Sequence, residues 1–362
     1  MKVRLEIYTK TTTGGYESTP TIITNDEIIS INIDRRIFEI GTCSVVLDNT
    51  KRDKILHDYL NHYGLGYTDN YNMIKLYINN KTAFTGVIKE YKFDEDNNTY
   101  HFRADDMIYK IFRAIDCTPY LIYKNTTAKQ IIKSIFNHAG INKVNFSNDI
   151  ADYSVNQIRI EYNTMYVDVL EKFFNTMYAR FYCNNDGSVD IVRAYPPYDG
   201  VPITKYKLES KDFISSGQYD RSDNNIRNKV VVKSGDADAQ AFECPYLVKH
   251  CNGEIYLDVI DEELANTFEK KRNVALKYFR DKLRHSKRFS LTTVNGSLDR
   301  KIGDIARIVF NKSEGARGWG MLNGISSSIQ DGNWQDTLEI ELLVGDSWIL
   351  PQKSSGNYII KS

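Results

Sequence analysis

Asp94, Asp96 and Asn98 have the spacing with which a calcium-binding loop begins. Such a loop takes carboxylate and amide oxygens from alternate positions, needs glycine at its sixth position and ends with a bidentate glutamate at its twelfth. Here the sixth position is Thr99 and the twelfth is Asp105. Because Asp and Asn are also typical turn residues, we interpret the segment as a hairpin turn rather than a calcium site.

Cys244, His250 and Cys251 supply three side chains of the types that bind zinc. Their spacing matches no zinc motif and a fourth ligand is not evident, so a structural role is favoured, while ligand binding by these three stays an open alternative. His57 and His62 lie five residues apart, which puts them on different faces of a helix and argues against a shared metal ion. The sequence therefore predicts no metal site.

Motifs for catalysis or cofactor binding are missing from the chain, which has no HExxH, Gly-x-Ser-x-Gly, phosphate-loop or CxxC motif. Asp105 and Asp106 are an acidic pair, but the sequence gives no distance between their carboxylates from which glycosidase chemistry could be argued. Gly315, Gly318 and Gly320 have the wrong order for a dinucleotide loop, which should also follow a strand and open a helix. We predict no catalytic residue and no cofactor, and expect a protein that is not an enzyme.

Basic residues gather between positions 270 and 288, with Asp281 as the single acidic residue among them. They are Lys270, Lys271, Arg272, Lys277, Arg280, Lys282, Arg284, Lys287 and Arg288. Such a cluster can contact nucleic-acid phosphates. Glu262, Glu263 and Glu269 precede it, however, and acid at the start with base at the end suits the dipole of a helix. A solvated or subunit-facing helix is therefore favoured over a nucleic-acid-binding one.

The balance of charge and the cysteine content narrow the class of protein. Lysine and arginine number 47, as do aspartate and glutamate, so no overall field attracts nucleic acid or an anionic membrane. Five scattered cysteines argue against a disulfide framework and for synthesis in a reducing cytoplasm. The N-terminal sequence MKVRLEIYTK alternates as a strand does, unlike a signal peptide, and no apolar run reaches the roughly eighteen residues of a membrane span.

Residues 1–112 have the alternation of short antiparallel strands with one buried face. Apolar residues alternate at Val3, Leu5 and Ile7, at Ile29, Ile31 and Ile33, at Cys43, Val45 and Leu47, and at Ile74, Leu76 and Ile78. The turn at 94–98 joins two further strands in a hairpin. Such strands predict a small β-barrel, interrupted at 48–72 by a polar insertion that we expect to hold a short helix and a loop.

Residues 113–204 change to helical periodicity and predict an α+β domain. Apolar positions from Ala128 to Ala139 fall on one face of a helix, with Thr127 and Gln130 placed as a capping box and Gly140 as its stop. A second amphipathic helix is predicted at about 164–178. It is followed by a hairpin that runs from Phe181 to Ile191.

From about 205 the strand pattern resumes, at Lys229-Val-Val-Val-Lys233 and in four further segments between 289 and 344. A charged helix at 262–285 interrupts it, and residues 349–362 are typical of a mobile tail. We therefore expect an α+β, mostly antiparallel β fold. In it, two small β-barrel domains, 1–112 and 205–348, flank the α+β domain at 113–204, with the helix inserted in the second barrel.

Short segments follow one another in a distinctive order along nearly the whole chain. They are Phe84-Thr-Gly86-Val87, Arg103-Ala-Asp105-Asp106, Thr126-Thr-Ala-Lys-Gln-Ile-Ile with Ala139-Gly140-Ile141, Asn225-Ile-Arg-Asn228-Lys-Val-Val-Val, Gly296 with Gly303-Asp304, and Gly324 with Thr337-Leu-Glu-Ile340. This order resembles the phage late control protein D and baseplate hub family, which includes the hubs of contractile tails, defective prophages and R-type bacteriocins. The 48–72 insertion and the long 234–260 connection depart from the family pattern.

The resemblance implies a homotrimer with two barrel domains per chain, whose six barrels form a ring that matches a sixfold tail tube. The implied partners are the tail tube or a tube-initiator protein, the central spike, the tape measure protein and the baseplate wedge, with no nucleic acid and no membrane. The chain would be made in the bacterial cytoplasm and assembled into a phage tail or a bacteriocin particle. Two alternatives remain: a tail-associated peptidoglycan hydrolase, and a nucleic-acid-binding module that uses the basic helix at 270–288.

Overall fold

In the computed structural model, the described residues are 1–51 except 12 and 14, 72–115, 120–195, 204–220, 227–235, 238–284, 288–309 and 318–343. Their fold is α+β and mostly antiparallel β, which confirms the predicted class. No helix among them is long and apolar enough to cross a membrane. The expected tail at 349–362 and most of the insertion at 48–72 lie outside the described residues.

The N-terminal region forms antiparallel strands, as the alternation predicts. The strands are β1 (Val3–Tyr8), β2 (Thr21–Thr24), β3 (Ile28–Arg36), β4 (Thr42–Asp48), β5 (Met73–Ile78), β6 (Lys81–Asp94) and β7 (Thr99–Asp106). Their buried faces share one core that includes Leu5, Val45 and Leu76. Ile29 does not join it and is 39% exposed, because a register shift in the pairing of β3 with β4 follows Ile28. The expected alternation is therefore wrong at Ile29 alone of its twelve positions.

Two helices and two small sheets make up the middle region. Its elements are η3 (Met107–Phe112), β8 (Tyr120–Thr127), α2 (Ala128–His138), β9 (Val144–Phe146), β10 (Ser154–Glu161), α3 (Tyr166–Met177), β11 (Ala179–Cys183) and β12 (Val189–Arg193). Thr127 and Gln130 form the predicted capping box of α2. Gly140 has φ +78, and the amide of Ile141 donates to the carbonyl of Phe136 at 2.8 Å, so the predicted stop is confirmed.

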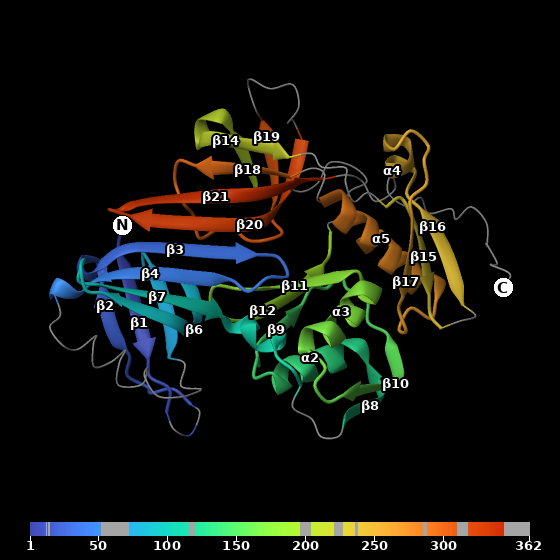
Figure 1. The fold of residues 1–362 in the computed structure, drawn as a ribbon, viewed down its shortest axis with the longest axis horizontal. Coiled ribbons are helices and arrows are strands. Elements are labelled where there is room, and N and C mark those ends of the chain that lie inside the picture. Colours follow the sequence, from blue (N-terminus) through green and yellow to red (C-terminus); the bar gives the residue numbers. More distant parts are fainter. Residues whose placement is uncertain are drawn as a thin grey trace.

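The C-terminal strands extend the sheet of the N-terminal region. They are β13 (Tyr206–Glu209), β14 (Phe213–Asp220), β18 (Arg288–Thr293), β19 (Ile305–Val309), β20 (Gly318–Gln330) and β21 (Asn333–Leu342). The joint between the regions is the antiparallel pair β3 and β20, in which Ile31 lies opposite Ile329 and Arg35 lies opposite Ile325 (Figure 1). Among the described residues, the two β regions thus form one sheet of thirteen strands, whose main path runs from β14 to β2.

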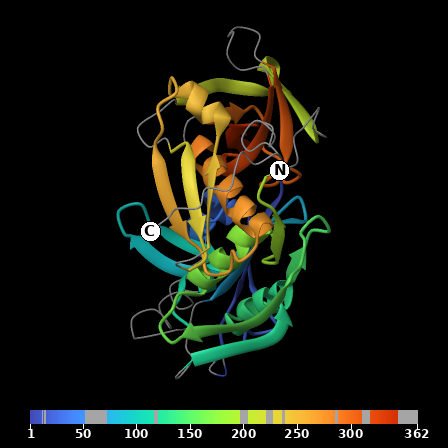
Figure 2. The same ribbon diagram turned by 90° about the vertical axis from the view of Figure 1, so that its right-hand side faces the viewer.

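The segment inserted into the C-terminal β region is larger than the predicted helix. It contains β15 (Lys229–Lys233), β16 (Ala239–Glu243), α4 (Pro245–His250), β17 (Leu257–Asp261) and α5 (Phe268–Arg284). β15 is a strand as predicted, but it lies in a separate three-stranded sheet with β16 and β17 instead of in the main sheet. α5 lies against this small sheet (Figure 2). The helix begins at Phe268, because residues 257–261 pair as β17 and the chain needs the next six residues to turn.

Candidate functional site

The candidate calcium ligands lie in the turn between β6 and β7, which confirms the predicted hairpin. Asp94 accepts hydrogen bonds from the backbone amide of Asn97 at 3.3 Å and from its side chain at 3.0 Å. These bonds lower the pKa of Asp94. Asn98 takes the left-handed conformation, with φ 48, that a tight turn requires. The carboxylate of Asp94 therefore forms the hydrogen bonds that close the turn.

Cys244 and Cys251 bracket the short helix α4, one before its first turn and one after its last. Cys244 is fully buried, and this burial raises the pKa of its thiol to about 11, so the thiolate form that binds metals is disfavoured. Across the described part of the chain, no three His, Cys, Asp or Glu side chains gather as they would around a metal ion. His57 and His62 lie outside the described residues.

Asp105 and Asp106 do not form an acid/base pair, because successive residues of a strand point to opposite faces. Asp105 forms an ion pair with Arg103 at 3.3 Å. Asp106 is buried at the end of β7 and accepts hydrogen bonds from the backbone amides of Gly41 at 2.9 Å and Ile108 at 3.1 Å. The second bond caps η3, so Asp106 fixes the exit from the N-terminal sheet.

The described part of the glycine segment, Gly318 to Gly320, lies in a strand and not ahead of a helix. Gly318 and Gly320 belong to β20 and pair with β19, while Gly315 lies outside the described residues. A strand cannot supply the helix N-terminus that a dinucleotide loop needs. These glycines therefore form part of the sheet.

The described part of the basic cluster on α5 packs partly or fully against the chain itself, so the prediction of a solvated helix is wrong, while a subunit-facing helix stays a prediction. Arg280 is 1% exposed and lies over the ring of Tyr195 at 5.1 Å. Lys271 is 3% exposed and forms an ion pair with Asp238. All six cluster residues with described side chains, which are Lys270, Lys271, Arg272, Lys277, Arg280 and Lys282, are at least partly buried.

The physical reason is that long basic side chains can bury their methylene stems while their charged ends find partners. Lys277 shows this: its ammonium group donates to the side-chain oxygen of Asn175 at 2.9 Å and lies 3.5 Å from the carboxylate of Asp281. The partners come from α3 and from α5 itself. This packing counts against the helix as a nucleic-acid-binding surface, because phosphate binding needs exposed cations.

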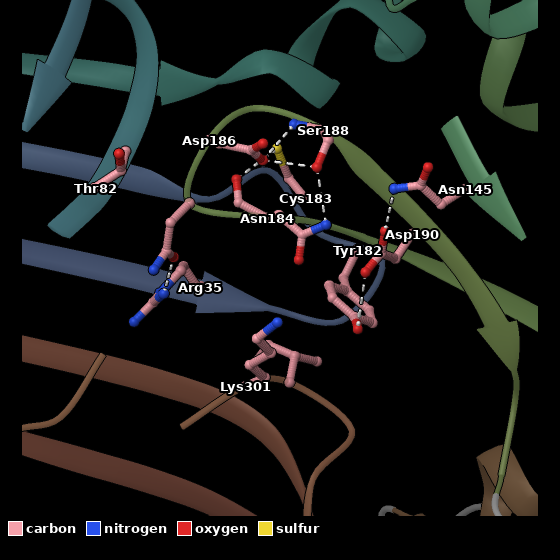
Figure 3. A pocket seen from close by; sticks show the side chains of 12 residues that line it. Arg35, Thr82, Asn145, Tyr182, Cys183, Asn184, Asp186, Ser188, Asp190 and Lys301 are labelled. Carbon is pink, nitrogen blue, oxygen red and sulfur yellow. Dashed lines mark hydrogen bonds between the residues drawn. The ribbon is translucent and has the colours of Figure 1, made fainter. Parts of the chain in front are cut away.

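A cavity of about 350 Å³ lies where the N-terminal, middle and C-terminal regions meet. Arg35 on β3 and Thr82 on β6 line it from the N-terminal region, the β11–β12 hairpin lines it from the middle region, and Lys301 and Ile302 line it from the C-terminal region. Figure 3 shows the hairpin side chains above Arg35 and Lys301. Sequence reasoning missed this site, because no pattern along the chain indicates which strand ends meet in space.

Hydrogen bonds between lining residues hold the polar wall of this cavity. Asp190 accepts from the side chains of Asn145 at 2.9 Å and Tyr182 at 3.5 Å (Figure 3). Asp186 accepts from the hydroxyl of Ser188 at 2.6 Å. Arg35 donates to the side chain of Asn185 and so ties β3 to the hairpin. The groups in this wall bond to one another, which suits a structural joint between regions.

The cavity also contains a thiol, but its environment does not activate it. Burial raises the pKa of Cys183 well above its usual value, and Asp106 nearby acts in the same direction. A catalytic thiol needs the opposite, a pKa lowered by neighbouring cations or a helix N-terminus. The polar wall of the cavity could form hydrogen bonds to a bound group, but the thiol of Cys183 is not activated as a nucleophile.

Comparison with known proteins gives matches in structure and none in sequence. No protein-family model matches the chain, and no curated protein matches it. Among solved structures, a 43 kDa tail protein of prophage MuSo2 from Shewanella oneidensis is 15% identical, with a TM-score of 0.69, and the match covers 96% of this chain and 100% of that one. A tail protein from Neisseria meningitidis is 12% identical, with a TM-score of 0.67, and covers 96% and 98%.

This chain has the fold of phage tail proteins. The tail-protein fold spans nearly all of the sequence, in agreement with the resemblance seen in the order of its segments. A component of the type VI secretion system from Escherichia coli is also similar, at 10% identity and a TM-score of 0.54, with 88% of this chain and 74% of that one covered.

Exposed apolar side chains gather at strand β17 and in the two residues that are described before it. Leu257 and Val259, on the outer face of β17, are 53% and 54% exposed. Ile255 and Tyr256 precede them and are 46% and 41% exposed. Within the described residues, β17 is also an end strand of its small sheet. An apolar face beside an end strand is typical of a surface that a partner covers.

Proposed function

We propose that this chain is a structural hub of a phage-type contractile tail, which joins the sixfold tail tube to the threefold central spike. The observation that carries the proposal is the β3–β20 joint, which places two β regions in one sheet within a tail-protein fold. A chain with two ring-forming modules meets a sixfold ring as a trimer, because three copies then supply six modules. In this proposal residues 1–112 and 205–348 face the tube.

The middle region, 113–204, lies toward the spike or at the periphery in this proposal. The further partners are a tube-initiator protein, the tape measure protein and the baseplate wedge. The chain would be made in the bacterial cytoplasm and then built into the tail of a phage or a bacteriocin. Its action is to hold these partners through buried surfaces rather than to catalyse a reaction.

Deleting the gene in a tail-producing strain tests the assembly role. We expect the deletion to abolish complete tails in electron micrographs, because tube and spike lose their connection, and expression of the intact chain to restore them. Gold-labelled antibody against the chain should mark one end of disrupted tails. Normal tails in the deletion strain would contradict the proposal.

A non-enzymatic role is the second part of the proposal. The observations that support it are the inactive environment of Cys183 and the separated carboxylates of Asp105 and Asp106. Zymography on bacterial cell walls checks it: the pure chain should leave no clearing band, beside lysozyme as a positive control. A clearing band would show that the chain is a wall hydrolase.

A further inference from the structure

The guanidinium group of Arg35 has hydrogen-bond donors that meet no acceptor. Arg35 lies on β3 and lines the cavity between the three regions (Figure 3). One of its nitrogens, Nη1, donates to the side-chain oxygen of Asn185. The other two, Nε and Nη2, are buried and have no hydrogen-bond partner among the described residues. A buried charged donor without an acceptor is costly, so these two nitrogens need an explanation.

The carboxylates whose charges act on Arg35 do not supply the acceptor. Burial lowers the pKa of Arg35, and the charges of Asp336 and Asp106 act in the opposite direction. Asp336 forms an ion pair with Arg300 at 2.6 Å. Burial raises the pKa of Asp106 to about 8, so this group is mostly uncharged at neutral pH. Neither carboxylate accepts a hydrogen bond from the Nε or Nη2 atom of Arg35.

The two nitrogens without an acceptor form a fork of defined geometry. In a guanidinium group the Nε–H and one N–H of Nη2 point the same way in one plane, which matches the two oxygens of a carboxylate. The bond to Asn185 is the one hydrogen bond of this guanidinium among the described residues. The group can therefore turn within the cavity toward a ligand without breaking other hydrogen bonds.

The other charged groups of the cavity select what else such a ligand carries. Lys301 lines the cavity as a second cation, while Asp186 and Asp190 line it as acceptors. Each of these carboxylates already accepts from a neighbouring side chain, but a carboxylate has about four acceptor sites. The lining thus combines donors for one carboxylate with acceptors for hydroxyl groups. Inorganic phosphate fits less well, because its charge would also face Asp186 and Asp190.

The size and exposure of the cavity suit a small molecule. Its volume of about 350 Å³ falls within the range of about 300–1,000 Å³ that is typical of small-molecule sites. Asp186 and Lys301 are exposed, so a ligand can reach the lining from the solvent. The hydrogen bonds among the hairpin side chains hold this wall in place before a ligand binds, which lowers the entropic cost of binding.

We propose that this cavity binds a small hydroxylated carboxylate of the sugar-acid class. The carboxylate lies on the fork of Arg35, and the hydroxyl groups donate to Asp186 and Asp190. A free amino acid fits less well, because its ammonium group would be repelled by Arg35 and Lys301. The inference goes beyond the hub role and does not depend on it.

Isothermal titration calorimetry of the purified full-length chain with D-glucuronate tests the inference. D-Glucose lacks the carboxylate, acetate lacks the hydroxyl groups, and inorganic phosphate lacks both. We expect glucuronate to bind, and each comparison compound to bind at least about tenfold more weakly, because each leaves part of the polar lining without a partner.

Two variants of lining residues locate the binding. Arg35→Lys keeps the positive charge but removes the fork, and should weaken glucuronate binding by at least about tenfold. Lys301→Gln changes an exposed side chain, and should weaken binding by at least about threefold while leaving the melting temperature unchanged.

Lys124→Gln on β8 is the matched control, because Lys124 is exposed and does not line the cavity. It should change glucuronate binding by less than about twofold, since a charge outside the cavity is screened by salt. The melting temperature of each variant shows whether it is folded. If Arg35→Lys does not fold, Lys301→Gln decides the question.

Absent glucuronate binding, equal binding of any comparison compound, undiminished binding by folded Arg35→Lys or by Lys301→Gln, or an equal loss in Lys124→Gln would each overturn the inference. None of these results bears on the hub proposal, which gene deletion and the position of the chain in the tail test separately.

Discussion

Asp336 and Asp106 are carboxylates that the fold buries at the joints between its strands, and each is held by several donors. Asp336 is 0% exposed and accepts from Arg300 at 2.6 Å, from the hydroxyl of Ser327 at 2.7 Å and from the indole of Trp334 at 3.0 Å. A buried, paired charge such as that of Asp336 adds little net stability, but removing its partner is costly. We therefore expect single substitutions at these positions to have large effects.

Asp336→Ala should lower the free energy of unfolding by about 3–5 kcal/mol, because Arg300 would keep a largely buried charge without its partner. Chemical unfolding in urea measures the change. Asp299→Ala is the matched control, since its side chain is 83% exposed and pairs at the surface with Lys81. The control should change stability by less than about 0.5 kcal/mol. An equally small effect of Asp336→Ala would contradict the assigned role.

Asp106 should make stability depend on pH. Burial raises its pKa to about 8, although the amides of Gly41 and Ile108 and the charge of Arg35 act in the opposite direction. The carboxyl pKa in the unfolded chain is about 3.9. The folded state therefore binds more protons between these values, so stability falls as the pH rises from about 4 to about 8 and then levels off.

Asp106→Asn removes this titration. The stability of the wild type relative to the variant should fall with rising pH, by at most about 1.4 kcal/mol per pH unit. Urea unfolding at several pH values between 5 and 9 follows the difference. Asp299→Asn, at an exposed position, should run parallel to the wild type. A constant difference between the wild type and Asp106→Asn would show that Asp106 is charged throughout this range.

At the scale of elements, the sequence predicted those features that depend only on neighbouring residues, such as helix ends and strands. The capping box of Thr127 and Gln130 and the stop at Gly140 depend on neighbouring residues only, and both are confirmed. Tyr178 ends α3 in the left-handed conformation, with φ 51, which the sequence does not reveal because the residue is not glycine. The β pattern predicted strands well for the same reason, since alternation is a local property.

Which elements lie beside one another in space could not be predicted in this way. The run Lys229–Lys233 is a strand, but its three valines do not say which strands lie beside it. The charges on α5 indicated a solvated or subunit-facing helix, yet Arg280 and Lys271 are buried. Their partners, Tyr195 and Asp238, lie far from them in the sequence, so a local charge pattern does not reveal the burial. The junction cavity at Arg35 has the same origin, as its walls come from three regions.

Gly86 in β6 shows why an element can require one particular residue. A Cβ atom at this position would lie 2.3 Å from the carbonyl oxygen of Asp105 and 2.5 Å from the ring of Phe84. Gly86→Ala should therefore separate β6 from β7 and lower the melting temperature by several degrees, as expected for a loss of about 2 kcal/mol or more.

Gly318→Ala is the control for this substitution, because nothing lies within 4 Å of a Cβ atom there. It should change the melting temperature by less than about two degrees, since a small side chain in open space at a strand position costs little. Differential scanning calorimetry on both variants makes the comparison. Equal melting temperatures for the two would mean that the approach of β6 to β7 is not tight.

At the scale of the whole molecule, the shared sheet has the strongest consequence for assembly. β3 and β20 pair along seven residues each, so the two β regions are joined directly within one sheet. A molecule built in this way can meet a ring of identical tube subunits at two positions. We expect it to form trimers, because three such pairs complete a sixfold ring.

The most direct test of the hub proposal is a cryo-electron-microscopy reconstruction of the intact tail at a resolution that resolves strands. We predict three copies of the chain between the last tube ring and the spike, with their six β regions in a ring beneath the tube. Density for the chain in the sheath or in the tail fibres, or six copies in a ring, would contradict it.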